Sequence, residues 1–474
     1  MLFNSLSFVI FLAVQLFLYN LPFSWRVKKI NLLWGSYIFY AAWNPPFVAL
    51  LWFSTVLDWF AAKWLYATES RTKRRALLVV SLGANLALLG FFKYGRFLLD
   101  NFVALMGLLG VPFHPATPDI ILPVGISFYT FQTMSYTIDV YLGKTAPAKS
   151  FLSYALYVTF FAQLVAGPIV RSEDFLPQCD GPRKVTARHL GWGFSLLILG
   201  LFEKMVLADT LLAPLAERVY DATASPTLGD GWCATLAFAG QIFCDFAGYS
   251  TCALGLALCF GFVLMQNFRF PYAALGPSDF WRRWHISLST WLRDYLYVPL
   301  GGNRHGALLT CRNLALTMLL GGLWHGASWT FVVWGALHGF YLVAERAVRG
   351  LVPPSRLWGR WPVRLALAVL TFLLVCVGWV FFRARTFGRA FAILGSMLGF
   401  AQPAAPGLIP LPKVAGVAAF TAVLLGVHWL LRDSSIERAA MRLPWWARSL
   451  VLALLMIAIV TMTGEDRAFI YFQF

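Results

Sequence analysis

The chain has 474 residues, of which 59% are hydrophobic and only 12% are charged, and its formal net charge is +17. This balance excludes a soluble globular domain, since average soluble chains carry about 25% charged residues. Nucleic-acid binding is excluded as well, because much of the positive charge lies in short loops and no segment has a soluble basic face with interleaved aromatics. We expect an all-α polytopic membrane protein, because the apolar runs are too long for barrel strands and only helices and closed barrels satisfy their backbone in lipid.

The first apolar segment, residues 2–23, has no basic residue before it and is followed directly by the basic run 26–29. A cleavable signal peptide has the opposite charge layout, so we expect a retained first span with the N-terminus outside. Residues 31–66 are expected to form a hairpin that bends at 44–46 (Asn-Pro-Pro). This hairpin would return the basic run 71–75 to the cytoplasmic side.

Further apolar segments follow at 76–92, 97–110, 120–142, 151–170, 190–212, 231–263, 313–347, 363–382, 388–400, 413–431 and 446–463. They predict a single integral-membrane domain over residues 1–474, with ten to thirteen membrane segments and no soluble domain. Residues 160–171 contain Gly167-Pro168 and are predicted to be re-entrant, which is allowed only where protein covers the backbone. No internal repeat of the inverted-transporter kind is visible.

Residues 278–300 do not resemble a span, because tryptophan and leucine at helical spacing are mixed with charged side chains. We expect one helix in the membrane interface, capped by Ser278 and ended by Pro299 with Gly301-Gly302. The longer stretch from Arg269 to Arg312 contains two aspartates, at 279 and 294, and six arginines, at 269, 282, 283, 293, 304 and 312. Arginine matches phosphate oxygens, so the region can hold a polyanionic cosubstrate at the cytoplasmic mouth; contact with lipid headgroups is the alternative.

His325 lies in a run without Asp, Glu, Lys or Arg that extends from Leu314 to Ala344. About 20 apolar residues already span the hydrocarbon core, so an ionisable side chain here is a candidate functional site. Burial favours the neutral imidazole, which is the form that a general base needs. The neighbouring Gly321, Gly322 and Gly326 allow a broken helix and close approach of a substrate. A histidine that joins two helices by a hydrogen bond is the alternative.

Other chemistry-bearing signals are few. His285 lies on the 278–300 segment, and His338 is expected to be a helix contact. Serine-nucleophile, zinc-protease and Walker motifs are absent from the sequence, and its seven cysteines include no C-x-x-C pair. The chain ends in an aromatic hexapeptide (469–474), which predicts either an interfacial anchor or a tail whose Tyr471 hydroxyl enters the site.

The central motifs resemble membrane-bound O-acyltransferases, in the branch of bacterial polysaccharide O-acetylation that alginate O-acetyltransferases typify. The resemblance covers most of the chain. The motifs are FWRRWHISLSTWLRDYLY (280–297), PLGGNR (299–304), GGLWHGA (321–327), LPVGISFYTF (122–131), AGPI (166–169), DFAGYS (245–250) and FIYFQF (469–474).

This resemblance implies a bowl of membrane helices in which a cytoplasmic funnel meets an outer funnel at a catalytic histidine, a position that matches His325. The second polar position of the family matches His285, and the C-terminal tyrosine relay of related systems matches Tyr471. Acetyl-CoA is the implied acetyl donor, and no metal or permanently bound cofactor is expected. The candidate donor-binding residues are Arg282, Arg283, Arg293, Asn303, Arg304 and Trp324.

Together these inferences predict an O-acetyltransferase of the bacterial inner membrane that serves a polysaccharide biosynthesis complex. Neutral His325 would take a proton as the Tyr471 hydroxyl attacks the thioester, and a periplasmic SGNH-type partner would place the acetyl group on the polymer. Alginate-type exopolysaccharide is favoured as acceptor over cellulose or peptidoglycan, and membrane lipid is the remaining partner. The alternatives are a transporter or flippase, a scaffold for the periplasmic acetylase, and the carrier-bound aminoacyl donor of the teichoic-acid branch.

Overall fold

The computed structural model of the chain describes residues 1–116, 118–352, 355–400, 407–462, 467 and 469–470, and within them it contains helices but no β-strand. Six of the described helices are long and apolar enough to cross a membrane, namely Pro45–Ala67, Arg71–Leu108, Leu228–Cys259, Ala307–His325, Trp361–Arg383 and Leu411–Leu431. The prediction of an all-α polytopic membrane protein is confirmed. The number of ten to thirteen membrane segments stays a prediction.

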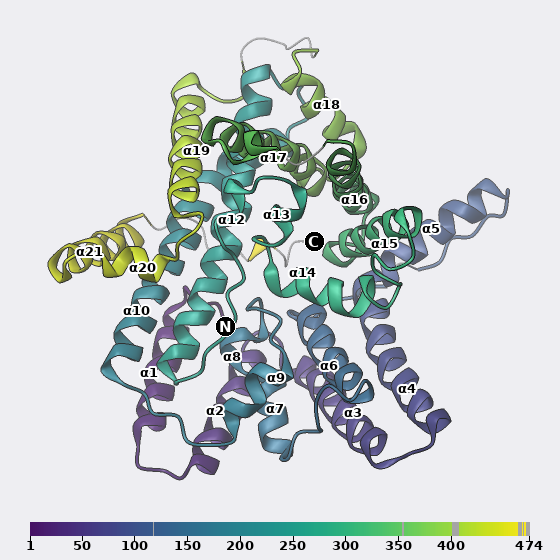
Figure 1. Ribbon diagram of the computed structural model, residues 1–474, viewed down its shortest axis with the longest axis vertical. Helices are drawn as coiled ribbons and strands as arrows, with labels where there is room; N and C mark the ends of the chain where they lie inside the picture. The colour runs from purple at the N-terminus through teal and green to yellow at the C-terminus, as the bar shows by residue number, and fades with distance from the viewer. Residues whose placement is uncertain (117, 353–354, 401–406, 463–466, 468, 471–474) are drawn as a thin grey trace. The chain divides into compact units, whose positions relative to one another are not determined.

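The chain divides into two compact units, each of which contains candidate spans (Figure 1). The first unit comprises residues 1–197 and 252–265, and the second comprises 198–251 and 266–474. The bowl and the single membrane domain over 1–474 stay predictions.

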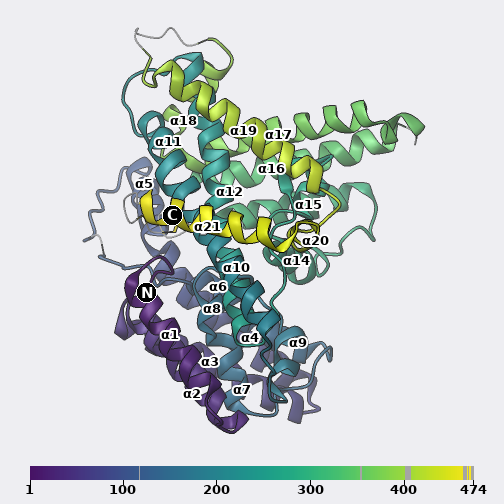
Figure 2. The ribbon, with the colours of Figure 1, turned by 90° about the vertical axis from the view of Figure 1, so that its left-hand side faces the viewer.

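The first unit is built from α1 (Leu6–Asn20), α2 (Trp25–Ala41), α3 (Val48–Ala67), α4 (Arg71–Leu89), α5 (Gly95–Leu108), α6 (Ile126–Tyr141), α7 (Phe151–Thr159), α8 (Phe161–Leu164), α9 (Ser172–Phe175) and most of α10 (Ala187–Leu201). Helices α1 and α2 lie side by side in both ribbon views (Figure 2). The predicted hairpin over 31–66 is confirmed, because a 3₁₀ turn at Pro45–Phe47 separates α2 from α3.

A buried carboxylate joins three helices of the first unit. Asp58 on α3 accepts hydrogen bonds from the Ser81 hydroxyl, from Asn85 Nδ2 at 2.8 Å and from Thr137 Oγ1 at 3.0 Å. These residues come from α3, α4 and α6, and all are buried. Since a buried polar group without partners is costly, the network fixes the mutual position of these helices.

Residues 160–171 are all buried, and only α8 within them is helical. The Gly167-Pro168 pair predicted a break in the helix that protein must cover, because lipid cannot form hydrogen bonds with free amide groups. The re-entrant path of this segment stays a prediction.

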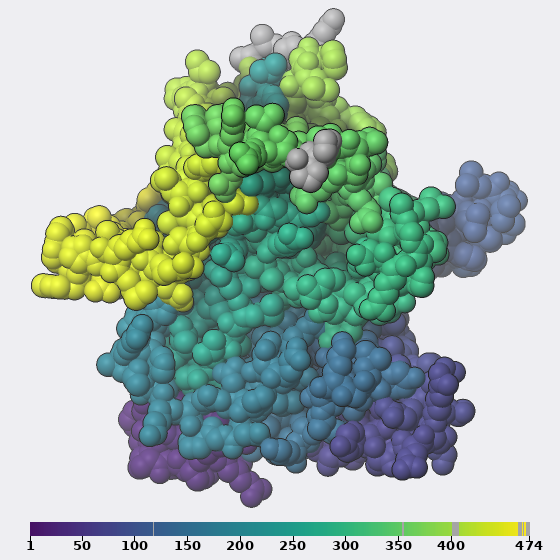
Figure 3. Space-filling view, viewed as in Figure 1, coloured from purple at the N-terminus to yellow at the C-terminus, as the bar shows by residue number. Residues whose placement is uncertain are grey.

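The second unit continues with α11 (Ala213–Tyr220), α12 (Leu228–Cys259, of which residues 228–251 belong here), α13 (Pro277–Trp281), α14 (Ile286–Leu292), α15 (Ala307–His325), α16 (Trp329–Leu351), α17 (Trp361–Arg383), α18 (Phe387–Met397), α19 (Leu411–Leu431), α20 (Ile436–Met441) and α21 (Trp445–Thr461). None of the residues of α21 is buried, and Figure 3 shows the outer surface of this yellow helix uncovered, although the helix also contacts residues 202–212. Its apolar side chains are therefore available to lipid.

The prediction of a single helix over 278–300 is wrong, because α13 ends at Trp281 and α14 begins at Ile286. Ser278 does not cap a helix with its side chain; its amide and hydroxyl donate to Glu345 Oε2 on α16 at 2.8 and 2.6 Å. The break has a physical cause outside the segment. The Arg269 amide donates a hydrogen bond to the Arg283 carbonyl at 2.9 Å, so this carbonyl does not accept a hydrogen bond within a continuous helix.

The apolar run 313–347 is also two helices, α15 and α16, which pack closely through glycines. A Cβ on Gly335 would collide with the Met318 carbonyl oxygen, and a Cβ on Gly322 would lie 2.9 Å from the Gly335 Cα. Small residues at such a contact let the two backbones approach, as is common where helices pack in membranes.

We expect Gly335→Ala to lower the free energy of unfolding by about 1–3 kcal/mol, because the added methyl group overpacks the contact between α15 and α16. Gly350→Ala is the matched control, since it lies on the same helix and a Cβ there meets no atom within 4 Å. Thermal unfolding in detergent measures both. Equal stabilities would contradict the close packing.

Candidate functional site

The second unit brings His285 and His325 together, although forty residues separate them in the chain. Their ring centroids lie 6.2 Å apart, and the two residues are 0% and 2% exposed. His325 is the last residue of α15, and His285 directly precedes α14. Two buried imidazoles at this distance can both contact one small reacting group.

His285 has a left-handed backbone, with φ 43° and ψ 55°. This conformation costs about 1–3 kcal/mol for a residue with a Cβ, and it persists only where the surroundings enforce it. Asn267 supplies that constraint. Its carbonyl accepts the Ile286 amide at 2.9 Å, and its Oδ1 accepts the Ser287 amide at 3.2 Å and the Ser287 hydroxyl at 2.9 Å.

Asn267 therefore accepts the N-terminal amides of α14, which the N-cap residue His285 does not bind with its own side chain.

Burial lowers the pKa of His285 to about 3, so its ring is neutral at physiological pH. A neutral imidazole carries one N–H donor and one acceptor nitrogen.

An aromatic shell encloses the two imidazoles. The Phe246 ring on α12 lies 4.6 Å from His285, and the rings of Trp334 on α16 and Phe382 on α17 lie 4.9 and 5.4 Å from His325. Such a shell excludes water and strengthens electrostatic interactions inside it. Phe246 was identified from the sequence only as part of the DFAGYS motif, and Trp334 and Phe382 were not identified, because the three residues come from different apolar segments.

The position of His325 at the end of α15 has an electrostatic consequence. A helix carries partial negative charge at its C-terminus, which stabilises a nearby cation by about 0.3–1 kcal/mol. The α15 terminus therefore favours the positive charge that forms when the His325 ring accepts a proton. This is the arrangement that a general base needs.

The predicted donor-binding residues divide into two groups. Trp324 is buried beside both histidines, with its ring 5.0 Å from His325 and 5.9 Å from His285. Four of the other predicted residues are exposed on the surface, namely Arg282, Arg293, Asn303 and Arg304.

Arg283 is buried and held by an ion-pair network. Its guanidinium contacts Asp279 at 2.9 Å and donates to the Arg432 carbonyl at 2.9 Å. Burial opposes the charge on Asp279. Hydrogen bonds from the Leu275 amide and from the Arg283 and Arg432 guanidinium groups outweigh burial and lower the pKa of this carboxyl below its ordinary value. These contacts give Arg283 a structural task within the second unit.

The C-terminal tail is tied to α12 next to the histidines. The Ile470 amide donates to Asp245 Oδ2 at 2.9 Å, and the Phe469 ring lies 5.4 Å from Phe246 and 5.1 Å from Tyr249. Phe246 also packs on His285, so the tail and that histidine share an aromatic neighbour. Tyr471, the predicted relay residue, lies outside the described residues.

A buried charge cluster supports this attachment. The Lys204 ammonium pairs with Asp245 and lies 2.9 Å from Asp209, and the three side chains are at most 10% exposed. From the sequence, Asp245 was identified only as part of the DFAGYS motif, and Lys204 and Asp209 were not identified. The available signal was their place in the apolar segment 190–212, since charges in apolar membrane segments are costly and usually paired.

Comparisons with known proteins show the family of the chain. A sequence model of the membrane-bound O-acyltransferase family matches residues 148–384. A probable alginate O-acetylase of Pseudomonas putida is 40% identical over 100% of both chains. A peptidoglycan O-acetyltransferase of Helicobacter pylori is 38% identical over 78% of this chain and 74% of its own, and a teichoic acid D-alanyltransferase of Streptococcus thermophilus is 30% identical over 53% and 64%. Both histidines lie within the matched range.

Proposed function

Because the chain belongs to the membrane-bound O-acyltransferase family, it is a multi-pass membrane acyltransferase, and we propose that it uses cytoplasmic acetyl-CoA to acetylate an extracytoplasmic polysaccharide. The observation that carries the proposal is the convergence of buried His285 and His325 beside a C-terminal tail held by Asp245. An alginate-type polymer is favoured as acceptor, since the Pseudomonas putida relative spans the full chain; peptidoglycan, named for the Helicobacter pylori relative, is the second candidate.

In the proposed reaction, the Tyr471 hydroxyl attacks the thioester carbonyl of acetyl-CoA. A C–O bond forms to the tyrosine, the C–S bond breaks, and the thiolate of CoA leaves. His325 takes the phenolic proton and returns it to the thiolate, which balances the step. Tyrosine has an ordinary pKa of about 10, so a nearby base accelerates its attack.

His285 is proposed to stabilise the carbonyl oxygen as it becomes an oxyanion. Its neutral ring supplies an N–H donor, and the strained backbone before α14 fixes the ring in one place. The exposed Arg282, Arg293 and Arg304 are proposed to attract the phosphates of acetyl-CoA. Trp324, whose ring lies beside both histidines, is proposed to contact the donor there.

The acetyl group on Tyr471 is then proposed to pass to a periplasmic SGNH-type partner, which would acetylate the polymer. This order requires a bacterial inner membrane with the basic runs 26–29 and 71–75 in the cytoplasm and the N-terminus outside. The test of the whole proposal is incubation of the purified chain with radiolabelled acetyl-CoA. Transfer of the label to the chain supports the proposal, as does transfer to a polymer that is added together with the periplasmic partner. Acetyl-CoA that remains unchanged contradicts the proposal.

Substitution of Asp245 tests the attachment of the tail. We expect Asp245→Ala to lower kcat about 10- to 100-fold at unchanged KM for acetyl-CoA, because a charge-assisted hydrogen bond worth about 1.5–3 kcal/mol is lost at Ile470. Asp245→Asn keeps an acceptor oxygen, so its kcat should lie between that of Asp245→Ala and that of the wild type. Asp221→Asn is the control, since Asp221 pairs with Arg383 in the same unit and does not accept the Ile470 amide, which Asp245 binds.

Carboxypeptidase digestion gives a readout independent of activity. The tail of the Asp245→Ala chain should be trimmed faster than that of the wild type, because Ile470 no longer has its carboxylate acceptor. Equal rates of trimming together with equal kcat would show that Asp245 does not position the tail.

A further inference from the structure

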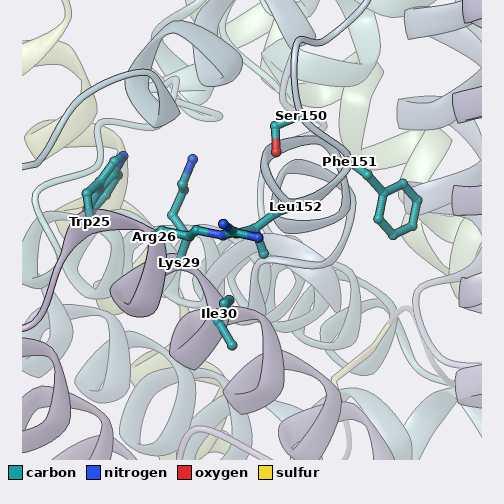
Figure 4. Close-up of a pocket in the computed structure, with 7 residues that line it drawn as sticks. All are labelled: Trp25, Arg26, Lys29, Ile30, Ser150, Phe151 and Leu152. Atoms are coloured by element: carbon teal, nitrogen blue, oxygen red, sulfur yellow. The ribbon is translucent and has the colours of Figure 1, made fainter.

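The first unit contains a pocket of about 510 Å³ between the beginnings of α2 and α7 (Figure 4). It is lined by Trp25, Arg26, Lys29 and Ile30 from α2 and by Ser150, Phe151 and Leu152 from α7. Neither the two histidines nor the tail belongs to this unit. No residue that lines the pocket has a role in the transfer reaction proposed above.

Its floor holds a buried positive charge. Lys29 is 9% exposed, and its ammonium donates to Ser153 Oγ at 2.8 Å and to the Cys179 carbonyl at 3.2 Å. Both acceptors are neutral, and in the described part of the chain no carboxylate lies within 4.0 Å of this ammonium. A buried cation without a counter-ion is costly, and an anion in the pocket would offset that cost.

Three further features of the pocket attract the same kind of ligand. Arg26 is exposed and forms no ion pair with any described residue. Helices α2 and α7 both present their N-termini here, where backbone N–H groups carry partial positive charge. Ser150 forms no side-chain cap, so the first amides of α7 remain open to a ligand. Phosphate oxygens suit such a site.

An apolar stripe leads away from the cations along α2. Ile30, Trp34 and Ile38 are spaced by four residues and are 37%, 64% and 53% exposed. Residues at this spacing lie on one face of a helix, so the stripe is continuous with the pocket through Ile30. A soluble phosphate compound would leave this face unused, whereas an acyl chain would cover it.

We propose that this pocket binds the phosphate of an anionic phospholipid, with Lys29 and Arg26 on the phosphate and an acyl chain along Ile30, Trp34 and Ile38. The apolar stripe favours a membrane lipid over a soluble phosphate compound, because only the lipid has a phosphate for the cations and an acyl chain for the stripe.

Native mass spectrometry of the full chain in detergent micelles tests the proposal, with dioleoyl phosphatidylglycerol or dioleoyl phosphatidylcholine added. We expect retention of the anionic lipid to be about tenfold weaker in Arg26→Gln and in Lys29→Gln, since each removes a charge-assisted contact. Lys28→Gln should match the wild type, because Lys28 lies on the same helical turn but places its ammonium 5.1 Å from the Tyr19 ring, outside the pocket.

Equal retention of phosphatidylglycerol by wild type and Arg26→Gln would overturn the proposal. So would equal retention of the zwitterionic lipid, or complete displacement by inorganic phosphate, which would identify a site for soluble anions. If the Lys29 variant does not fold, the exposed Arg26 decides the question alone.

Discussion

Substitution of His325 by Gln is expected to lower kcat for acetyl transfer about 10²- to 10⁴-fold while the chain stays folded. Glutamine fills a similar volume and keeps polar atoms within the shell of Trp334 and Phe382, but it cannot accept a proton. The loss should appear in kcat and in kcat/KM alike, because the base acts in the transition state. Turnover of radiolabelled acetyl-CoA by purified protein measures it.

The control for this experiment is His338→Gln. His338 is another buried histidine of the second unit, and its ring packs 4.7 Å from Trp334. No role in the proposed transfer is assigned to it, so its variant should keep most of the wild-type rate. Near wild-type activity of the His325 variant would instead assign that ring to helix packing. The same result would revive the scaffold hypothesis, in which the chain only recruits a periplasmic acetylase.

Local patterns predicted much of the fold and one half of the site. The glycines around His325 are compatible with the break that ends α15, and the Asn-Pro-Pro turn predicted the hairpin of α2 and α3. Both signals are contained in a few neighbouring residues, where turn chemistry acts directly on the backbone.

The remaining features depend on partners that are distant in the chain. The 278–300 segment breaks because Asn267 and Arg269 take over its backbone hydrogen bonds, which helical spacing within the segment does not reveal. Asp245 meets Lys204 at a separation of 41 residues and Ile470 at 225. Periodicity identifies the apolar face of each helix but not which helices meet, so such pairs require the tertiary structure.

These distant contacts also give the candidate site its physical character. Asn267 maintains the left-handed backbone of His285 and so fixes its position, while burial keeps its imidazole neutral. His325 instead ends a helix whose dipole favours a proton on its ring. Two histidines in different environments thus suit two different tasks, donation of a hydrogen bond and acceptance of a proton.

Replacement of Tyr471 by Phe is expected to abolish acetylation, with a loss of at least about 10³-fold, because the proposed nucleophile is the hydroxyl that this change removes. The aromatic ring remains, so the contacts of Phe469 and Ile470 with α12 should persist. Tyr341→Phe is the matched control, since it removes a buried hydroxyl from α16 of the same unit.

The decisive measurement is mass spectrometry of the wild-type chain after incubation with acetyl-CoA in the absence of a polymer partner. The relay requires one acetyl group on the C-terminal peptide that contains Tyr471, and that group should disappear when partner and polymer are added. The His325→Gln chain should carry little of it, because the attacking hydroxyl then lacks its base. Acetylation of polymer by the Tyr471→Phe chain at the wild-type rate would rule out the relay and leave direct transfer from the donor at His325.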